Sequence, residues 1–339
     1  MRGLVIKSTG SSYIVRMDDG VDAECHIKGN FRIRGIRSTN PVAVGDFVEV
    51  QTLPDGTQWI KEIEERRNYI IRRSTNLSKE SHILAANIDQ AALLVTINHP
   101  VTSTTFIDRF LATCEAYRVR ALLIFNKIDL LTDEEKERSE ELRALYEGLG
   151  YPTLAICARQ LNTADVLPLM ANKTTLLSGN SGVGKSTLLN ALFGKELTRT
   201  GKISDAHDKG MHTTTFSEMY FLSEGGAVID IPGIKGFGSV DMSKEEVSHY
   251  FREIFRVSKD CRFGNCTHTN EPGCAVLQAV ENGELDPRRL ESYRKLEQEA
   301  GYAGLSSREI EVKKSERMFK EVGGMKNVRR YVKEHSKQK

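Results

Sequence analysis

Short apolar runs separated by turn residues fill the first part of the chain, from residue 1 to about residue 73. Five of these runs favour β-strands, and glycine or aspartate lies between them. They cover residues 4–6, 13–15, 25–27, 47–50 and 59–60. About five strands in so short a segment predict a small closed barrel, and the oligonucleotide-binding barrel is one of the few folds of that size. An SH3-like barrel is the alternative.

A group of basic residues with one aromatic residue lies in the middle of this barrel segment. It consists of Lys28, Phe31, Arg32, Arg34 and Arg37. Cations beside an aromatic ring suit single-stranded RNA, because bases stack on the ring while phosphates pair with the cations. Ordinary surface charge explains these residues equally well when they are considered alone.

After a polar stretch at residues 74–81, which we interpret as a linker, strands alternate with helices. Continuous apolar runs at 91–97, 121–125 and 152–156 predict buried parallel strands. Apolar residues at helical spacing predict a helix over 104–118, and Thr132 with Glu135 forms a capping box that starts another. This order predicts a doubly wound α/β sheet, which we assign to residues 82–240.

The last part of the chain, residues 241–339, is predicted to be helical. Ser243 and Glu246 form a second capping box, and Asp286 with Pro287 starts a further helix. Between residues 313 and 339, ten Lys or Arg stand against three Glu, which gives this tail a net charge of +7. Such a charge suits phosphate contacts, but a solvated helix face or an irregular terminus explains it too.

The composition narrows the class of protein. Hydrophobic residues make up 39% and charged residues 28% of the chain, as in soluble globular proteins. No apolar run approaches the ~20 residues that a bilayer span needs, and charges interrupt the first residues too early for a signal peptide. We therefore expect a cytoplasmic protein without a membrane partner.

One segment carries the chemistry around which the rest can be arranged. Residues 178–187 fit the pattern G-x-x-x-x-G-K-[ST] between an apolar strand and a helix start. Backbone N–H groups of such a loop surround phosphates, while Lys185 reaches the β and γ oxygens and Ser186 holds Mg²⁺. The predicted phosphate-binding residues are Gly179, Asn180, Ser181, Gly182, Val183, Gly184, Lys185, Ser186 and Thr187.

A second motif follows the predicted strand at 121–125, at the edge where open α/β sheets bind ligands. The residues Asn126, Lys127, Ile128 and Asp129 resemble the N-K-x-D element of GTPases. The resemblance implies that Asn126 contacts N7, that Lys127 lies over the ring and that Asp129 accepts hydrogen bonds from guanine. Adenine would leave that carboxylate unpaired. A weaker S-A-x element is formed by Cys157, Ala158 and Arg159, with a backbone amide for the guanine O6.

The switch elements come later in the chain. A polar, glycine-bearing loop at residues 201–212 is followed by Thr213, Thr214 and Thr215, one of which is expected to complete the Mg²⁺ shell. The strand at 227–229 leads to a D-x-x-G element, in which Asp230 holds Mg²⁺ through water and the Gly233 amide meets the γ-phosphate.

The position after Gly233 bears on catalysis. It is Ile234, where many GTPases have a glutamine that orients water. Slow intrinsic hydrolysis is therefore expected, and His212 is the candidate for the missing catalytic group. Alternatively, His212 is an exposed switch residue without a chemical role.

A cysteine and histidine cluster predicts one structural zinc ion. Its residues are Cys261, Cys266, His268 and Cys274. Three thiolates and one imidazole close a tetrahedral shell with no open position. Disulfides are disfavoured in a reducing cytoplasm, and free core thiols are the alternative.

The order of the motifs is a circular permutation, because the guanine-reading elements precede the phosphate loop and switches. With the segment at 210–215 and the Cys-Cys-His-Cys spacing, it resembles the RsgA family (YjeQ or YloQ), permuted bacterial GTPases of small-subunit biogenesis. The resemblance implies a permuted P-loop GTPase sheet with an oligonucleotide-binding barrel at 1–73 and a zinc-knuckle domain at 241–339. It implies hydrolysis of Mg²⁺-bound GTP to GDP, stimulated by the maturing 30S subunit and its 16S rRNA, as a late assembly or release checkpoint.

Two other functions remain as alternatives. One is an RNA-binding scaffold in which nucleotide is structural, although the Mg²⁺-binding residues favour an enzyme. The other is a translation factor or signalling GTPase with a protein partner, against which the barrel and basic tail argue mildly. A monomer is expected in each case.

Overall fold

The computed structural model describes residues 1–9, 12–27, 41–73, 81–194, 217–231, 242–301 and 309. The basic group of the barrel segment (Lys28 to Arg37) and the basic tail (313–339) lie outside the described residues. Among the helices that are described, none has the length and apolar character to cross a membrane.

Five strands close into a small N-terminal barrel, as the sequence predicts. They are β1 (Arg2–Ser8), β2 (Tyr13–Met17), β3 (Asp22–His26), β4 (Phe47–Thr52) and β5 (Gln58–Ile63). Their order is β1-β2-β3-β5-β4, and pairing of β1 with β4 completes the closure. Alternate residues such as Val5, Tyr13 and Val48 are completely buried inside. This barrel agrees with the expected oligonucleotide-binding type.

A two-stranded ribbon follows the barrel. β6 (Tyr69–Arg73) pairs antiparallel with β7 (Ser81–Ala86), not with the barrel strands. The sequence pattern predicted residues up to 73 as part of the barrel, and the ribbon was not predicted. Ile70 and Ala85 of the ribbon are buried in the core of the central sheet, so the ribbon packs beside that sheet.

Five parallel strands form the central sheet. They are β8 (Gln90–Val95), β9 (Arg120–Asn126), β10 (Thr153–Ile156), β11 (Thr174–Gly179) and β13 (Ala227–Asp230). The order is β10-β9-β8-β11-β13, with β12 (Ser217–Phe221) antiparallel at the end. After β8 the chain adds β9 and β10 on one side of β8, whereas β11 and β13 lie on its other side. The order of the strands thus reverses between β8 and β11, and open sheets bind ligands at such a point.

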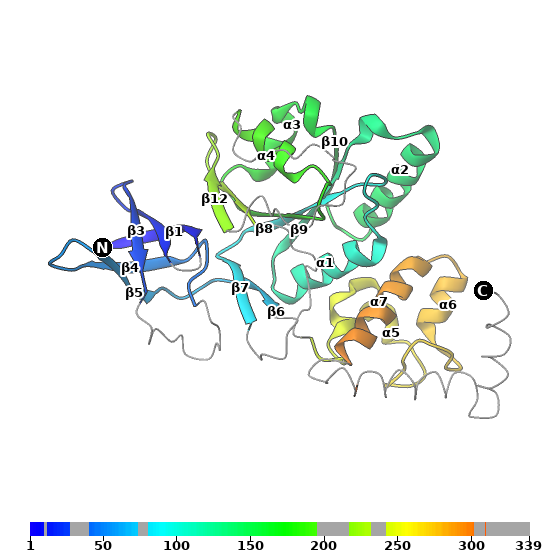
Figure 1. Cartoon of the computed structure of the whole chain (residues 1–339). Coiled ribbons are helices and arrows are strands. Elements are labelled where there is room, and N and C mark those ends of the chain that lie inside the picture. The colour runs from blue at the N-terminus through cyan, green and yellow to red at the C-terminus, as the bar shows by residue number, and fades with distance from the viewer. Residues whose placement is uncertain are drawn as a thin grey trace.

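Helices cover both faces of this sheet (Figure 1). α1 (Thr104–Ala116) and α2 (Asp133–Gly148) bury apolar residues against one face. α3 (Thr163–Met170) and α4 (Lys185–Phe193) do so against the other. The capping box of Thr132 and Glu135 at the start of α2 is confirmed, since each side chain accepts from the backbone of the other.

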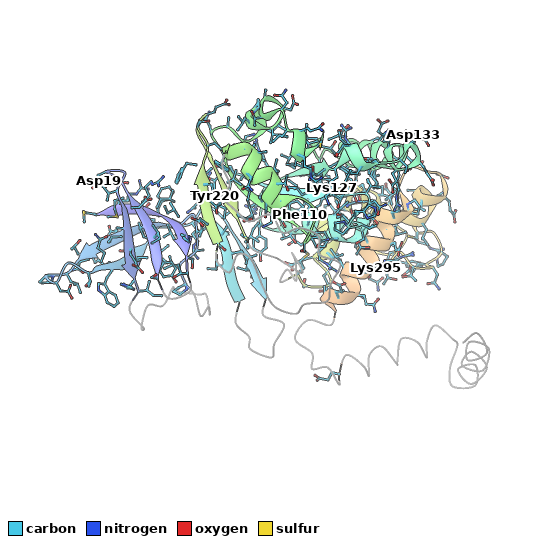
Figure 2. All side chains as sticks on the ribbon, turned by 45° about the horizontal axis from the view of Figure 1, so that its top comes forward. Asp19, Phe110, Lys127, Asp133, Tyr220 and Lys295 are labelled. Carbon is cyan, nitrogen blue, oxygen red and sulfur yellow. The ribbon has the colours of Figure 1, made fainter. Side chains whose placement is uncertain are left out.

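The barrel and the central sheet are hydrogen-bonded to each other. β1 pairs antiparallel with β12, and Lys7 forms an ion pair with Glu218 at 3.1 Å. Arg16 of the barrel lies over the ring of Phe221 at 4.4 Å. Figure 2 labels Tyr220 on β12, on the side of the sheet that faces the barrel. The barrel thus extends the sheet beyond its antiparallel edge strand.

The C-terminal part forms a small helical domain against α1. It contains the 3₁₀ turn η3 (Val247–Tyr250), α5 (Arg252–Ser258), α6 (Ala275–Glu281) and α7 (Pro287–Ala300). Asp286 caps α7 as predicted. The helix predicted after Ser243 is wrong in detail, because Phe251 has φ −115° and ψ 87° and separates η3 from α5. Complete burial of the Phe251 side chain in the domain core accompanies this break.

A buried ionic cluster joins this domain to the central sheet domain. Arg289 of α7 donates to Asp108 of α1 at 2.6 Å and to Glu253 of α5 at 2.7 Å. Tyr146 of α2 donates to the same Asp108 oxygen at 2.9 Å. Asp108 and Arg289 are 0% and 1% exposed, so neither charge is stabilised by water. The Asp108 carboxylate therefore depends on a cation from the other domain, and Arg289 is shared between Asp108 and Glu253 of its own domain.

Removing one member of this cluster should be strongly destabilising. Asp108→Ala leaves Arg289 buried without its interdomain partner, and we expect a loss of about 3–5 kcal/mol in unfolding free energy. Glu291→Ala removes an exposed pair with Lys295 on the same helix α7, and it should cost less than about 1 kcal/mol. Urea denaturation followed by circular dichroism measures both, and equal losses would contradict the expectation.

Candidate nucleotide-binding site and metal centre

The carboxyl ends of the five parallel strands bring the predicted nucleotide-binding residues to one edge of the sheet. β11 leads into the phosphate loop, β9 into Asn126 and Lys127, β10 into Cys157, and β13 ends in Asp230. Leu177 pairs with Asp230, and Asn126 pairs with Ile156, so these ends are in register. Motifs far apart in the sequence are therefore adjacent in space.

The phosphate loop turns sharply between β11 and α4. Gly184 precedes α4 with φ 98°, a left-handed conformation that suits glycine. A Cβ atom at Gly184 would lie 2.3 Å from the Nδ2 atom of Asn126. Val183 is completely buried, while Ser181 and Gly182 are exposed. The loop thus approaches Asn126 more closely than any side chain at position 184 would allow.

Asn126 connects the phosphate loop to the S-A-x segment. Its Nδ2 atom donates to the Val183 carbonyl at 2.8 Å, and its Oδ1 atom accepts from the Ala158 N–H at 2.9 Å. The residue is only 3% exposed. The amide faces these two loops, whereas the sequence analysis expected it to contact guanine N7. The Ala158 N–H, an amide of the segment predicted to meet guanine O6, is donated to Asn126 in this structure.

Lys127 and Asp129 lie beside this bridge. Lys127 is in the left-handed region with φ 66°, and its Nζ atom donates to the His99 carbonyl at 2.6 Å. Burial, and then the charge of Arg159, lowers the pKa of Lys127. Asp129 is exposed in the 3₁₀ turn η1 (Ile128–Leu130). Burial and a hydrogen bond to Asp129 raise the pKa of the Cys157 thiol, so the two predicted guanine-reading segments touch.

Lys185 and Asp230 form an ion pair with each other. The Nζ atom of Lys185 donates to Asp230 and, at 2.9 Å, to the Ile231 carbonyl. Both side chains are largely buried, with 15% and 4% exposed. The sequence analysis assigned Lys185 to phosphate and Asp230 to Mg²⁺, so nucleotide and metal would have to separate this pair. Ser186 and Thr187 begin α4 nearby and are half-buried.

Five predicted site residues lie outside the described residues. They are His212, Thr213, Thr214, Thr215 and Gly233. The loop after β8 was missed by the sequence analysis although it reaches the same edge. A Cβ atom at Gly182 would lie 3.5 Å from the Pro100 ring, and the neighbouring His99 carbonyl holds Lys127. The sequence did contain one indication of this contact: the loop follows a predicted buried parallel strand, and such loops lie at the ligand-binding edge where the strand order reverses.

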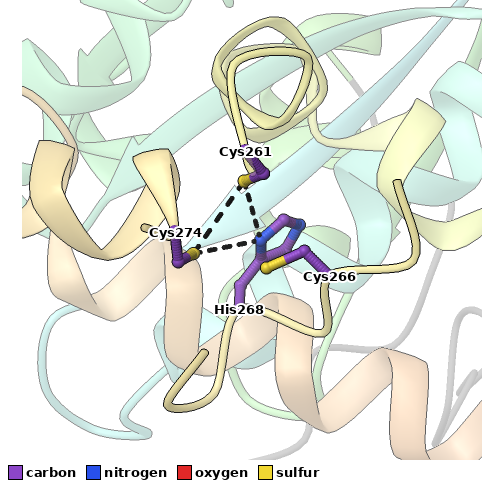
Figure 3. Close-up of side chains that lie close together, drawn as sticks. All are labelled: Cys261, Cys266, His268 and Cys274. Carbon is purple, nitrogen blue, oxygen red and sulfur yellow. Dashed lines mark hydrogen bonds between the residues drawn. The ribbon is translucent and has the colours of Figure 1, made fainter. Parts of the chain in front are cut away.

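The four predicted metal ligands converge on one point (Figure 3). The Sγ atoms of Cys261 and Cys274 lie 3.9 Å apart, and the Nδ1 atom of His268 is 3.6 and 3.4 Å from them. All four ligand atoms, including that of Cys266, lie within 4.8 Å of one another. Tetrahedral zinc at its usual bond lengths requires separations of about 3.5–3.8 Å. The cluster is therefore compatible with zinc binding.

The electrostatics of the cluster also suit a cation. Burial and the neighbouring Cys274 and Cys261 thiols raise the pKa of Cys266 to about 12, so the Cys266 thiol needs a positive ion nearby to lose its proton. Burial lowers the pKa of His268, which keeps the imidazole neutral and able to bind metal. Cys274 caps α6, and its sulfur accepts from the Leu277 N–H at 3.5 Å.

Hydrogen bonds hold the loop that carries His268, a residue with φ 54°. Glu271 accepts from the N–H groups of Thr267 and Thr269, each at 2.9 Å, on the two sides of the histidine. Arg294 of α7 donates to the His268 carbonyl. The backbone that carries the histidine is thus held by groups that are not predicted ligands themselves.

The fold and the site together define a class of protein. A phosphate loop and a base-reading segment meet at one edge of a parallel sheet, but the base-reading segment comes first along the chain. This is a circularly permuted GTPase, as the sequence predicts.

Comparison with known proteins specifies the family. The family model described as "RsgA GTPase" matches residues 63–240. The family model described as "RsgA N-terminal domain" matches residues 2–60. The small ribosomal subunit biogenesis GTPase RsgA of Phocaeicola vulgatus is 58% identical over 294 residues, covering 86% of this chain and 95% of the relative. The protein of that name from Porphyromonas gingivalis is 58% identical over 299 residues, with the same coverage of both chains.

Two solved structures are similar over most of the chain. YjeQ from Thermotoga maritima has 32% identity and a TM-score of 0.67, covering 88% of this chain and 98% of that one. YloQ, a circularly permuted GTPase, has 32% identity and a TM-score of 0.64, covering 88% and 94%. The chain therefore belongs to the RsgA GTPase family, and the predicted family, fold class and GTPase activity are confirmed.

The close approach of Gly184 to Asn126 can be tested directly. In Gly184→Ala the new Cβ displaces the Asn126 amide and shifts the phosphate loop, so guanine-nucleotide affinity should fall about 100-fold. Gly194→Ala is the matched control. Gly194 also has a positive φ, 61°, at the other end of α4, but a Cβ atom at this position would have no neighbouring atom within 4 Å. Titration with a fluorescent GDP analogue compares them, and equal affinities would refute the steric argument.

Proposed function

We propose that this chain binds the maturing 30S ribosomal subunit through its 16S rRNA and hydrolyses GTP to GDP and phosphate as a late assembly or release checkpoint. The relatives named small ribosomal subunit biogenesis GTPase support this role. The observation that carries the nucleotide assignment is the Asn126 bridge between the phosphate loop and the base-reading segment. A protein with that partner is expected in the cytoplasm and as a monomer.

The phosphates and Mg²⁺ occupy the loop before α4 in this proposal. The N–H groups of residues 179–187 surround the phosphates, and Lys185 leaves Asp230 to bind the β and γ oxygens. Asp230 would hold Mg²⁺ through water, together with Ser186 and one of Thr213, Thr214 and Thr215. Lys185 and Asp230 already lie together, so binding would replace their mutual ion pair by contacts of the lysine with phosphate and of the carboxylate with the metal shell.

The base is read by the segments that follow β9 and β10. Asp129 accepts two hydrogen bonds from guanine, which adenine cannot donate, and its exposed position at the sheet edge leaves it accessible. The Lys127 stem covers one face of the ring beside Ile128. Cys157 orients Asp129, while Ala158 and Arg159 line the O6 side. Asn126 holds these segments at a fixed distance from the phosphates.

Hydrolysis requires a group that Ile234 cannot supply. In the proposed mechanism the attacking water is oriented by His212, next to the predicted switch threonines, and the Gly233 amide contacts the γ-phosphate. Binding of the 30S subunit completes this arrangement, so turnover on the free protein is slow. In this proposal the barrel and the basic tail are the parts of the chain whose charge suits rRNA.

One structural zinc ion is proposed for Cys261, Cys266, His268 and Cys274. Zinc would supply the positive charge that three clustered thiolates require, and it would tie α6 to the loop before it. No open ligand position remains, so the ion has no part in hydrolysis.

GTP turnover with and without purified 30S subunits tests the function. We expect low turnover alone and stimulation by 30S that declines as salt rises, because rRNA contacts release counterions. His212→Ala should keep GTP affinity and lose most of the stimulated single-turnover rate, whereas Lys185→Ala should lose binding. Absence of stimulation at every salt concentration would contradict the ribosomal proposal, and an unchanged rate in His212→Ala would exclude that histidine.

Metal analysis tests the zinc proposal. The purified protein should contain one equivalent of zinc, and Cys266→Ser should lower the zinc content and hydrogen-exchange protection of residues 261–281. Cys157→Ser is the control, since Cys157 and Cys266 are both half-buried but only Cys266 belongs to the cluster. Full zinc occupancy in Cys266→Ser would be incompatible with the proposed shell.

A further inference from the structure

The loop between β8 and α1 makes contacts that the proposed nucleotide-binding residues do not explain. Its residue His99 has φ 52°, and its carbonyl accepts from the Nζ atom of Lys127 at 2.6 Å. His99 itself is exposed, so its own side chain does not fix this position. The carbonyl must be held by neighbouring groups.

Asn98 provides the first of these contacts. Its Oδ1 atom accepts from the His99 N–H at 2.9 Å, and its Nδ2 atom donates to Glu135 at 2.7 Å. Both ends of the Asn98 amide are therefore engaged, one by the loop and one by helix α2. The same loop is closed by Thr102, whose N–H donates to the Thr96 carbonyl at 2.9 Å.

Glu135 anchors this contact to the start of α2. One of its oxygens accepts from Asn98, and the other accepts from the Thr132 N–H at 3.0 Å. These hydrogen bonds lower the pKa of Glu135, so the carboxylate stays ionised near neutral pH. A continuous series of hydrogen bonds thus runs from the α2 N-terminus through Glu135, Asn98 and the His99 backbone to Lys127.

We infer that Asn98 and Glu135 are positioning residues for the guanine site. They hold the His99 carbonyl where it fixes the ammonium group of Lys127, so that the Lys127 stem is in place before the purine ring of GDP or GTP arrives. Preorganisation of this kind lowers the cost of binding. The inference rests on the proposed role of Lys127, and it assigns a nucleotide-binding function to a helix cap outside the known motifs.

Three variants of the full-length protein test it through GDP affinity, measured with a fluorescent analogue. Asn98→Ala should weaken GDP binding about tenfold, the size expected for losing a hydrogen bond beside a charged group. Lys127→Met should also weaken binding, and Asn98→Ala should add less than about twofold to it, because both act through one contact. Thr132→Ala breaks the same capping box without touching Asn98, and it should change GDP affinity less than about twofold.

Exchanging the amide of Asn98 and the carboxylate of Glu135 distinguishes a positioning role from a merely structural effect. Asn98→Asp alone places a carboxylate against Glu135 and should weaken GDP binding at least about tenfold. The double change Asn98→Asp with Glu135→Gln reverses the donor and acceptor but keeps each hydrogen bond and the total charge. It should recover affinity to within about threefold of the unmodified protein.

The outcomes separate the two levels of the argument. Unchanged affinity in Lys127→Met would overturn the proposed role of Lys127 and the inference with it. Three other outcomes would overturn the inference alone. The first is weakened GDP binding in Lys127→Met with normal binding in Asn98→Ala. The others are additive effects of these two changes, and no recovery of affinity in the double change Asn98→Asp with Glu135→Gln.

Discussion

Two hydrogen bonds of a single buried amide, that of Asn126, hold together the loops on which nucleotide binding depends. The carbonyl of Val183 and the N–H of Ala158 come from segments that follow different strands, the first in a turn and the second at the start of a short 3₁₀ helix, Ala158–Gln160. Because the amide is 3% exposed, water does not compete for these bonds. The Asn126 side chain thereby sets the spacing between the predicted phosphate-binding and base-binding segments. The close approach is possible because Gly184 has no side chain.

This constraint explains why the order of the motifs along the chain matters so little to the site. Parallel pairing requires only that neighbouring strands be in register, and the pairs of Leu177 with Asp230 and of Asn126 with Ile156 satisfy that requirement. The connections run elsewhere, through helices on both faces. A permuted chain can therefore build the same edge, while its free ends emerge at new places and carry new domains.

The sequence predicted the chemistry better than the contacts. Spacing alone predicted the phosphate loop, the base-reading segment and the four candidate metal ligands, since those motifs need particular residue types at fixed intervals, and the structure brings the four candidate ligands together. It did not predict that Lys185 would pair with Asp230, or that Asn126 would face Val183, because both depend on strands brought together from distant segments. The β6–β7 ribbon was missed because its residues had been divided between the barrel and a linker, and the burial of Arg289 was hidden in an ordinary amphipathic helix pattern.

Each flanking domain is attached to a different side of the nucleotide site. The barrel is joined through β12, which begins directly after the predicted first switch, so its β1 strand is hydrogen-bonded to the strand next to that switch. The helical C-terminal domain is joined through α1, which packs on the sheet with one face and binds Arg289 with the other. Since α1 follows the loop that holds Lys127, the predicted base-reading segment and the C-terminal domain are connected through one helix. A partner that contacts both flanking domains would therefore act on the phosphate side through β12 and on the base side through α1, by two separate physical routes.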